Sequence, residues 1–132
     1  MDDIFEILHI EDSVADIEFI GEILRELNSS LKIRNAKDGV QAIDLLSQSQ
    51  SLPNFILLDL NLPRKNGWEF IDELGRHQEW KEIPIYILST TPDAPRKLGV
   101  QTSQVRKFFV KPDEFSEMKR IYETIRDDLR RS

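Results

Sequence analysis

The sequence predicts an α/β protein with a doubly wound, five-stranded parallel sheet and helices on both faces. Two observations lead to this fold class. Short runs of β-branched and other apolar residues alternate along the chain with stretches of helical periodicity. Several of these stretches also begin with side chains suited to capping a helix. Strands that alternate with helices form parallel sheets through right-handed crossovers, which place helices on both faces.

Five short apolar runs are the expected strands. Each has about the length of an ordinary strand and is bounded by polar or turn-forming residues. The run FILLD is the most apolar of them, and it ends on Asp59. The expected strands are residues 4–10, 31–36, 54–59, 83–88 and 105–110.

The first two helices have recognisable caps. Ser13 and Asp16 have the spacing of a capping box and predict a helix that runs to about Asn28. Asp38 is expected to cap a second helix, which ends in the polar residues 47–51. The apolar face of the first helix is expected to contain Val14, Ile17, Ile20, Leu24 and Leu27.

The later helices differ in how clearly they are predicted. Asn66 and Glu69 form a capping pair at the start of a third helix, and the final helix follows Asp113. Residues 91–104 contain two prolines and a glycine and little apolar periodicity. They predict a short or irregular fourth helix, and the conformation of the segment from Pro92 to Gly99 is left open.

Composition limits the classes of protein to which the chain can belong. Its 132 residues fit one domain, 1–132, and it has no cysteine from which disulfides could form. The start is not basic and apolar like a secretory signal, and no apolar run is long enough to cross a bilayer. The net charge of −6 argues against a nucleic-acid surface. We expect a cytoplasmic protein that binds neither membranes nor nucleic acid directly.

Chemically active side chains follow four of the five predicted strands. An isolated charge is costly to bury, so a carboxylate that ends an apolar strand must be paired, metal-bound or solvent-facing. Because the carboxyl ends of parallel strands meet at one edge of a sheet, these side chains are expected to converge there. They are Glu11 and Asp12 after the first strand, Asp59 after the third, Ser89 and Thr90 after the fourth, and Lys111 after the fifth.

Three carboxylates at one edge require a cation. Two unit charges about 5 Å apart repel by roughly 3 kcal/mol at an effective dielectric constant near 20. Mg²⁺ prefers such hard oxygen ligands and leaves room for a phosphoryl oxygen. Asp59 is then expected to act as a nucleophile that forms an acyl phosphate, with Lys111 and Ser89 contacting the phosphoryl oxygens.

Four motifs together resemble the receiver domain of bacterial two-component response regulators. They are ILHIEDS, ILLDLNLPRKNG, YILST and FFVKP, and the resemblance extends from Ile4 to about Asp128. It implies a flavodoxin-like strand order of 2-1-3-4-5. The segments HIEDSVADIEFI and LLDLNLPRKNGWEF are most similar to single-domain regulators that work with phytochrome-type sensor kinases.

The resemblance also implies a role for individual residues. Asp59 corresponds to the phosphoacceptor, and Gly67 to a loop-closing glycine. The implied Mg²⁺ ligands are Glu11, Asp12, Asp59 and the backbone carbonyl of Asn61; the implied phosphoryl-binding residues are Lys111, Ser89 and Thr90; and the implied switch residues are Ser89 and Phe108. Structural alternatives exist for three of these assignments. The Glu11–Asp12 pair could cap the first helix, Lys111 could form only a surface salt bridge, and Phe108 could belong to the core. His9 is interpreted as a core or partly exposed structural residue and not as a catalytic or phosphorylated one.

The implied function is that of a phosphoacceptor signalling protein and not of a general enzyme. A sensor histidine kinase or phosphotransfer protein would phosphorylate Asp59, and the changed surface would bind a downstream protein or pass the phosphoryl group onward. We expect no output domain after Ser132 and therefore no direct contact with DNA, and we leave a homodimer open. Two alternative functions use the same kind of site or fold. A magnesium phosphohydrolase would have a second aspartate where Asn61 stands, and a pseudo-receiver would lack the intact site.

Overall fold

The computed structural model describes residues 4–60, 67–90 and 104–131. Five parallel strands form one sheet in the order β2-β1-β3-β4-β5, which confirms the order implied by the resemblance. The predictions for Asn61, for the Asn66 cap and for the fourth helix lie outside the described residues. The strands are β1 (Glu6–Ile10), β2 (Lys32–Ala36), β3 (Phe55–Asp59), β4 (Ile85–Ser89) and β5 (Val105–Val110).

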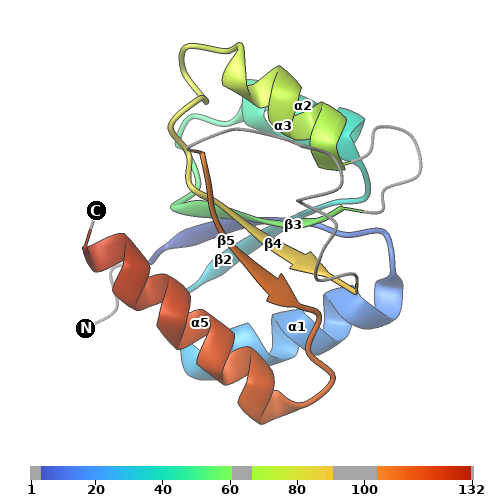
Figure 1. Cartoon of the computed structure of the whole chain (residues 1–132), viewed down its shortest axis with the longest axis vertical. Helices are drawn as coiled ribbons and strands as arrows, with labels where there is room; N and C mark the ends of the chain where they lie inside the picture. Colours follow the sequence, from blue (N-terminus) through green and yellow to red (C-terminus); the bar gives the residue numbers. More distant parts are fainter. Residues whose placement is uncertain (1–3, 61–66, 91–103, 132) are drawn as a thin grey trace.

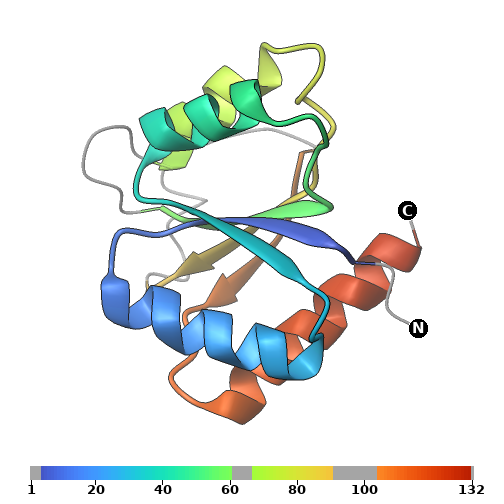
Figure 2. The same cartoon turned by 180° about the vertical axis from the view of Figure 1, so that it is seen from behind.

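Helices cover both faces of this sheet, as the alternating pattern predicted. Figures 1 and 2 show α1 and α5 on one face and α2 and α3 on the other. The first two helices end where the sequence indicated, within one residue. The helices are α1 (Val14–Leu27), α2 (Gly39–Gln48), α3 (Gly67–Gly75) and α5 (Phe115–Arg130). No helix among the described residues has the length and apolar character needed to span a bilayer.

The apolar core forms two layers, one on each face of the sheet. In β3, Ile56 and Leu58 pack on the side of α2 and α3, whereas Phe55 and Leu57 pack on the side of α1 and α5. Side chains alternate between the faces of a strand, so Asp59 continues the row of Phe55 and Leu57. The alternation of side chains in β3 therefore directs the Asp59 carboxylate toward the face of the sheet that α1 covers.

The start of α1 differs from the predicted capping box in one respect. The Ser13 Oγ accepts a hydrogen bond from the Asp16 backbone N–H at 3.3 Å, as expected of a cap. The Ser13 N–H, however, donates to Glu11 Oε2 at 3.2 Å and not to the Asp16 carboxylate. Val14 is exposed and not part of the apolar face, because this first turn lies beside polar strand ends.

Gly67 allows α3 to begin close to the end of β3. Its backbone N–H donates to the carbonyl of Leu60 at 3.0 Å. A Cβ at this position would lie 2.8 Å from the Leu60 Cα, a distance that no relaxed structure tolerates. A side chain here would push the chain away from the residue that follows Asp59, so the glycine is needed for the close approach.

Candidate functional site

The carboxyl edge of the sheet brings together side chains that are far apart in the sequence. Glu11 follows β1, Asp59 is the last residue of β3, and Lys111 follows β5. The parallel register aligns these strand ends, since Asp59 pairs with Leu88 of β4 and the Lys111 N–H donates to the Ser89 carbonyl at 3.0 Å. The predicted convergence of these side chains is thereby observed.

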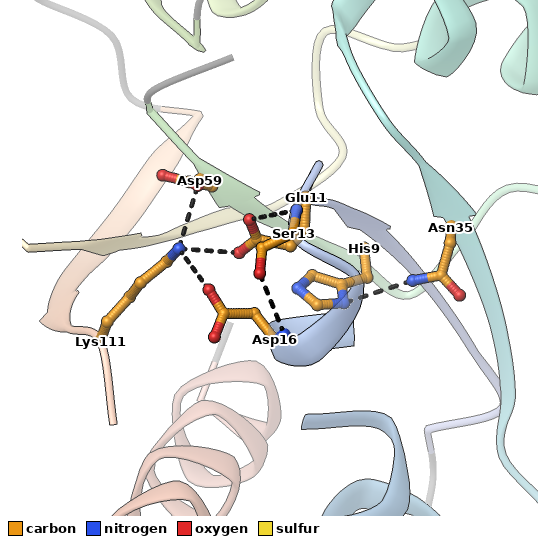
Figure 3. Close-up of polar contacts among 7 residues, drawn as sticks. All are labelled: His9, Glu11, Ser13, Asp16, Asn35, Asp59 and Lys111. Carbon is orange, nitrogen blue, oxygen red and sulfur yellow. Dashed lines mark hydrogen bonds and ion pairs between the residues drawn. The ribbon is translucent and has the colours of Figure 1, made fainter. Parts of the chain in front are cut away.

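The Lys111 ammonium lies among three carboxylates, each from a different part of the chain (Figure 3). Its Nζ is 2.9 Å from Glu11 Oε1, 2.9 Å from Asp16 Oδ2 and 3.1 Å from Asp59 Oδ2. The three partners belong to the β1–α1 connection, the first turn of α1 and the end of β3. One ammonium therefore links three segments of the fold at the sheet edge.

Burial makes this group of charges electrostatically unusual. The side chains of Glu11 and Asp59 are only 1% and 6% exposed. Burial raises the pKa of Glu11 to about 7, and the Asp59 charge adds to this effect while the Lys111 hydrogen bond opposes it. Burial alone would lower the pKa of Lys111, but its bonds to Asp16, Glu11 and Asp59 outweigh burial and raise it. The lysine therefore remains a cation.

Three of the acids at this edge are suited to holding a divalent cation. Glu11, Asp12 and Asp59 each place a carboxylate oxygen so that these atoms lie within 4.8 Å of one another. Asp12 is exposed, which leaves one side of the group open to solvent. An all-oxygen set with an open side suits Mg²⁺, which keeps several of its waters. The residues present thus fit the expected metal.

The remaining predicted residues occupy different surroundings at the same edge. Ser89 is 4% exposed and lies at the end of β4, whereas the adjacent Thr90 is exposed. Phe108 is 44% exposed, and its ring centroid lies 6.3 Å from that of Trp68 in α3. In the described structure, therefore, the Phe108 ring faces outward beside Trp68 and is not part of the core.

Asp16 is the site residue that sequence reasoning missed. Its spacing from Ser13 indicated a helix cap, and its carboxylate contacts Lys111 instead. The sequence does contain a signal for this contact. Asp59 lies in the row of β3 side chains that points to one face of the sheet, and the start of α1 lies beside the end of β1 at the same edge. The face that α1 covers follows only from the strand order and crossover handedness, which periodicity alone does not supply.

His9 lies next to the site but has the character of a core residue. It is 1% exposed, and its Nδ1 lies 3.4 Å from the Asn35 amide nitrogen. Burial, assisted by the Lys111 charge, lowers the pKa of His9 to about 4. The imidazole is therefore neutral at physiological pH, which agrees with its interpretation as a structural residue.

The family to which this fold and site belong is established by comparison. A family model described as the response regulator receiver domain matches residues 7–123. The chain belongs to the family of response regulator receiver domains.

Relatives in this family include regulators of similar size and structure. The chain is 30% identical over 130 residues to the probable methanogenesis regulatory protein FilR2 of Methanothrix harundinacea, covering 96% of this chain and 84% of FilR2. It is 37% identical over 90 residues to response regulator Rcp1 of Synechocystis sp., covering 64% of this chain but only 61% of Rcp1.

Two solved structures extend this comparison to three dimensions. The phosphorylated cyanobacterial phytochrome response regulator RcpA is 30% identical, with a TM-score of 0.75, and the match covers 92% of this chain and 90% of RcpA. The Mn²⁺-bound form of Rcp1 is 27% identical, with a TM-score of 0.72 and coverage of 92% and 91%.

Proposed function

We propose that this protein acts as a single receiver domain, residues 1–132, that accepts a phosphoryl group on Asp59 from a histidine kinase partner. The observation that carries the proposal is the position of Asp59. Its carboxylate lies at the sheet edge, 3.1 Å from the Lys111 ammonium and within 4.8 Å of the Glu11 and Asp12 carboxylates. A nucleophile, a fixed positive charge and a cation-binding group of acids are therefore adjacent.

The proposed reaction is a transfer between two side chains. An Asp59 carboxylate oxygen forms a bond to phosphorus as the P–N bond of the donor phosphohistidine breaks. The leaving imidazole nitrogen keeps the electron pair and takes up a proton from solvent. The Lys111 ammonium donates hydrogen bonds to the phosphoryl oxygens, on which negative charge is concentrated during transfer. The product is an acyl phosphate on Asp59.

Glu11, Asp12 and Asp59 are the residues that would hold Mg²⁺, together with the Asn61 carbonyl that the family resemblance implies. When bound, the metal supplies positive charge that offsets the phosphoryl oxygens and the crowded carboxylates. The donor set supports this proposal, and the Mn²⁺-bound form of Rcp1 is consistent with a divalent cation in this family.

Phosphorylation would then change the surface at the ends of β4 and β5. Ser89 and Thr90 would donate to the phosphoryl group, and Phe108 would turn inward as Ser89 moves. The outward Phe108 ring beside Trp68 supports this proposal, because an exposed apolar ring would gain burial by turning inward. The changed surface would bind a downstream protein, or the phosphoryl group would pass to a histidine of a phosphotransfer protein.

The similarity to RcpA and Rcp1 suggests the kind of partner. RcpA is described as a phytochrome response regulator, so a phytochrome-type sensor histidine kinase is the proposed phosphoryl donor. We place this protein in the cytoplasm, where such a kinase presents its catalytic portion. The acidic composition supports protein partners over direct contact with nucleic acid.

A small-molecule phosphodonor tests the first step. With acetyl phosphate and Mg²⁺, we expect the intact mass to rise by one phosphoryl group. The adduct should be absent in Asp59→Asn and present in Asp44→Asn, which removes an exposed carboxylate on α2. Wild-type protein that gains no mass would contradict the proposal. Turnover of added phosphate esters would indicate the phosphohydrolase alternative.

The emission of Trp68 tests the proposed switch in the same experiment. In a Trp80→Phe background only Trp68 reports, and its emission should change on phosphorylation because the neighbouring Phe108 ring moves away. Ser89→Ala should still form the adduct but lose the change in emission. If Trp68 emission does not change when the Trp80→Phe protein is phosphorylated, Phe108 is not part of the switch.

A further inference from the structure

Among the described residues, three carboxylates pair with the Lys111 ammonium, and the Asp16 carboxylate is the member of these three that the proposed metal site does not use. Lys111 Nζ is paired with Glu11, Asp16 and Asp59, and an ammonium has three N–H donors. Glu11 and Asp59 also belong to the acids that fit a divalent cation, whereas Asp16 does not. Figure 3 shows the Asp16 carboxylate approaching the ammonium from the α1 side, apart from the other two acids.

The Asp16 carboxylate is not needed to cap its own helix. The N-cap bond is made by its backbone N–H to Ser13 Oγ, and the N–H of Ser13 is taken by Glu11 Oε2. The side chain is thus available for a contact 95 residues away in sequence, which it makes at 2.9 Å. An acid that only stabilised the first turn would need no such partner.

A cation in this site changes what holds Lys111 in place. A cation held by the Glu11 and Asp59 carboxylates would compete with the ammonium for their negative charge, and it would repel the ammonium as a like charge. The lysine side chain is flexible, so an ammonium that lost both partners would sample many rotamers. Only Asp16 would then remain to keep it beside Asp59.

We propose that Asp16 is a positioning residue, which retains the Lys111 ammonium next to Asp59 while a divalent cation occupies the Glu11 and Asp59 carboxylates. The proposal rests on the proposed phosphoacceptor function and adds a residue to it. Without Asp16, Lys111 would depend on Glu11 and Asp59 alone and would compete more strongly with the metal. Loss of the negative charge of Asp16 would also weaken cation binding, so both effects lower the affinity for Mg²⁺.

The effect should appear in two measurements on the full chain. In Asp16→Asn, Mg²⁺ binding measured by calorimetry should weaken about two- to fivefold, the range that a half-exposed ion pair supports. Phosphorylation by acetyl phosphate at saturating Mg²⁺ should slow by a similar factor, because Lys111 is less often in place. Glu18→Gln removes the same charge at an exposed position two residues along α1, and both values should stay at wild type.

Two further variants separate positioning from a general effect of charge or helix stability. Asp16→Glu keeps the charge and should return both values to within about twofold of wild type. In a Lys111→Met background, Asp16→Asn should have a clearly smaller effect on Mg²⁺ affinity, because there is no ammonium to position. The melting temperature of Asp16→Asn should remain close to wild type, since the Ser13 cap uses a backbone donor.

Three results would overturn the inference: Asp16→Asn equal to Glu18→Gln in both measurements, Asp16→Glu as impaired as Asp16→Asn, or an undiminished effect in the Lys111→Met background. These differ from failure of the proposed function, which would appear as wild-type protein without any adduct. The calorimetric comparison needs no phosphorylation, so it decides the role of Asp16 toward Lys111 in either case.

Discussion

Two groups of paired charges in this protein differ in their balance. The site cluster comprises Lys111 with Glu11, Asp16 and Asp59, so one cation is shared by three acids. The Asp128 cluster lies between β4, β5 and α5. There a single carboxylate accepts a hydrogen bond from the Tyr86 hydroxyl and pairs with Arg106 Nε at 3.2 Å.

The pKa values of the two clusters move in opposite directions. Burial raises the pKa of Glu11 to about 7, more than Lys111 lowers it. Burial also acts to raise the pKa of Asp128, but the Tyr86 hydroxyl and the Arg106 charge outweigh it and lower the pKa. Within the described residues, Asp128 has a hydroxyl donor and a guanidinium partner, whereas three carboxylates of the site cluster share one ammonium, and a divalent cation would neutralise the remaining negative charge.

Removing the cation from each cluster should show the largest difference. Lys111→Met leaves Glu11 and Asp59 buried without their ammonium, and we expect it to lower the free energy of unfolding at pH 8 by about 3–4 kcal/mol. Arg106→Met leaves Asp128 its Tyr86 partner and should cost only about 0.5–1 kcal/mol. Urea unfolding with EDTA measures both.

Adding Mg²⁺ to these variants sharpens the comparison. It should restore much of the loss in Lys111→Met, because the metal replaces the missing positive charge, and it should not affect the loss in Arg106→Met. Equal losses in the two variants, or equal responses to the metal, would contradict the distinction between the clusters.

The contributions of Glu11 and Asp128 to the free energy of unfolding should change with pH in opposite directions. The folded pKa of Glu11, about 7, lies above its ordinary 4.5, so its contribution to metal-free stability falls as pH rises between these values. Relative to wild type, Glu11→Gln should therefore gain up to about 2–3 kcal/mol from pH 4.5 to pH 8. Asp128 has a lowered pKa, and its contribution is lost only as pH falls below its ordinary 3.8.

Unfolding of wild type and Glu11→Gln across this pH range, in EDTA, measures the difference directly. A stability difference that does not change between pH 4.5 and pH 8 would mean that Glu11 ionises as an ordinary surface carboxylate.

The smallest expected effects come from neutralising one acid in each cluster. Asp59→Asn relieves repulsion in the site cluster and should stabilise the metal-free protein by about 1 kcal/mol. Asp128→Asn weakens the bonds to Tyr86 and Arg106 and should destabilise it by about 1–2 kcal/mol. Thermal unfolding in EDTA distinguishes these outcomes, and a shift of the same sign in both variants would show that the clusters are alike.

Much of the fold was predictable because its signals are local. Apolar runs, helical periodicity and the caps at Ser13 and Asp38 depend on neighbouring residues, and each gave an element with nearly the observed bounds. The strand order could not be predicted from such local signals. It came from the family resemblance, because periodicity does not specify which strands are neighbours.

The site likewise has features that local signals predict and features that they do not. Residues at the strand ends were predictable, since carboxyl ends of parallel strands share one edge. The orientation of Phe108 was not predictable, because the alternation in β5 allows either phenylalanine to be buried. Only packing placed the partly buried Phe109 against the core and Phe108 beside Trp68. The sequence around Asp16 indicates only a helix cap, because the contact with Lys111 depends on residues 95 positions away.

By itself, the sequence determined the kind of fold, the edge at which the chemistry lies and the identity of the acids and lysine that meet there. Those properties follow from side-chain chemistry and from periodicities that extend over a few residues. Only the tertiary structure decided that one ammonium serves three carboxylates and that Asp16 is among them. Contacts across 95 residues depend on strand register and on the face that α1 covers, and both are settled by packing of the whole core.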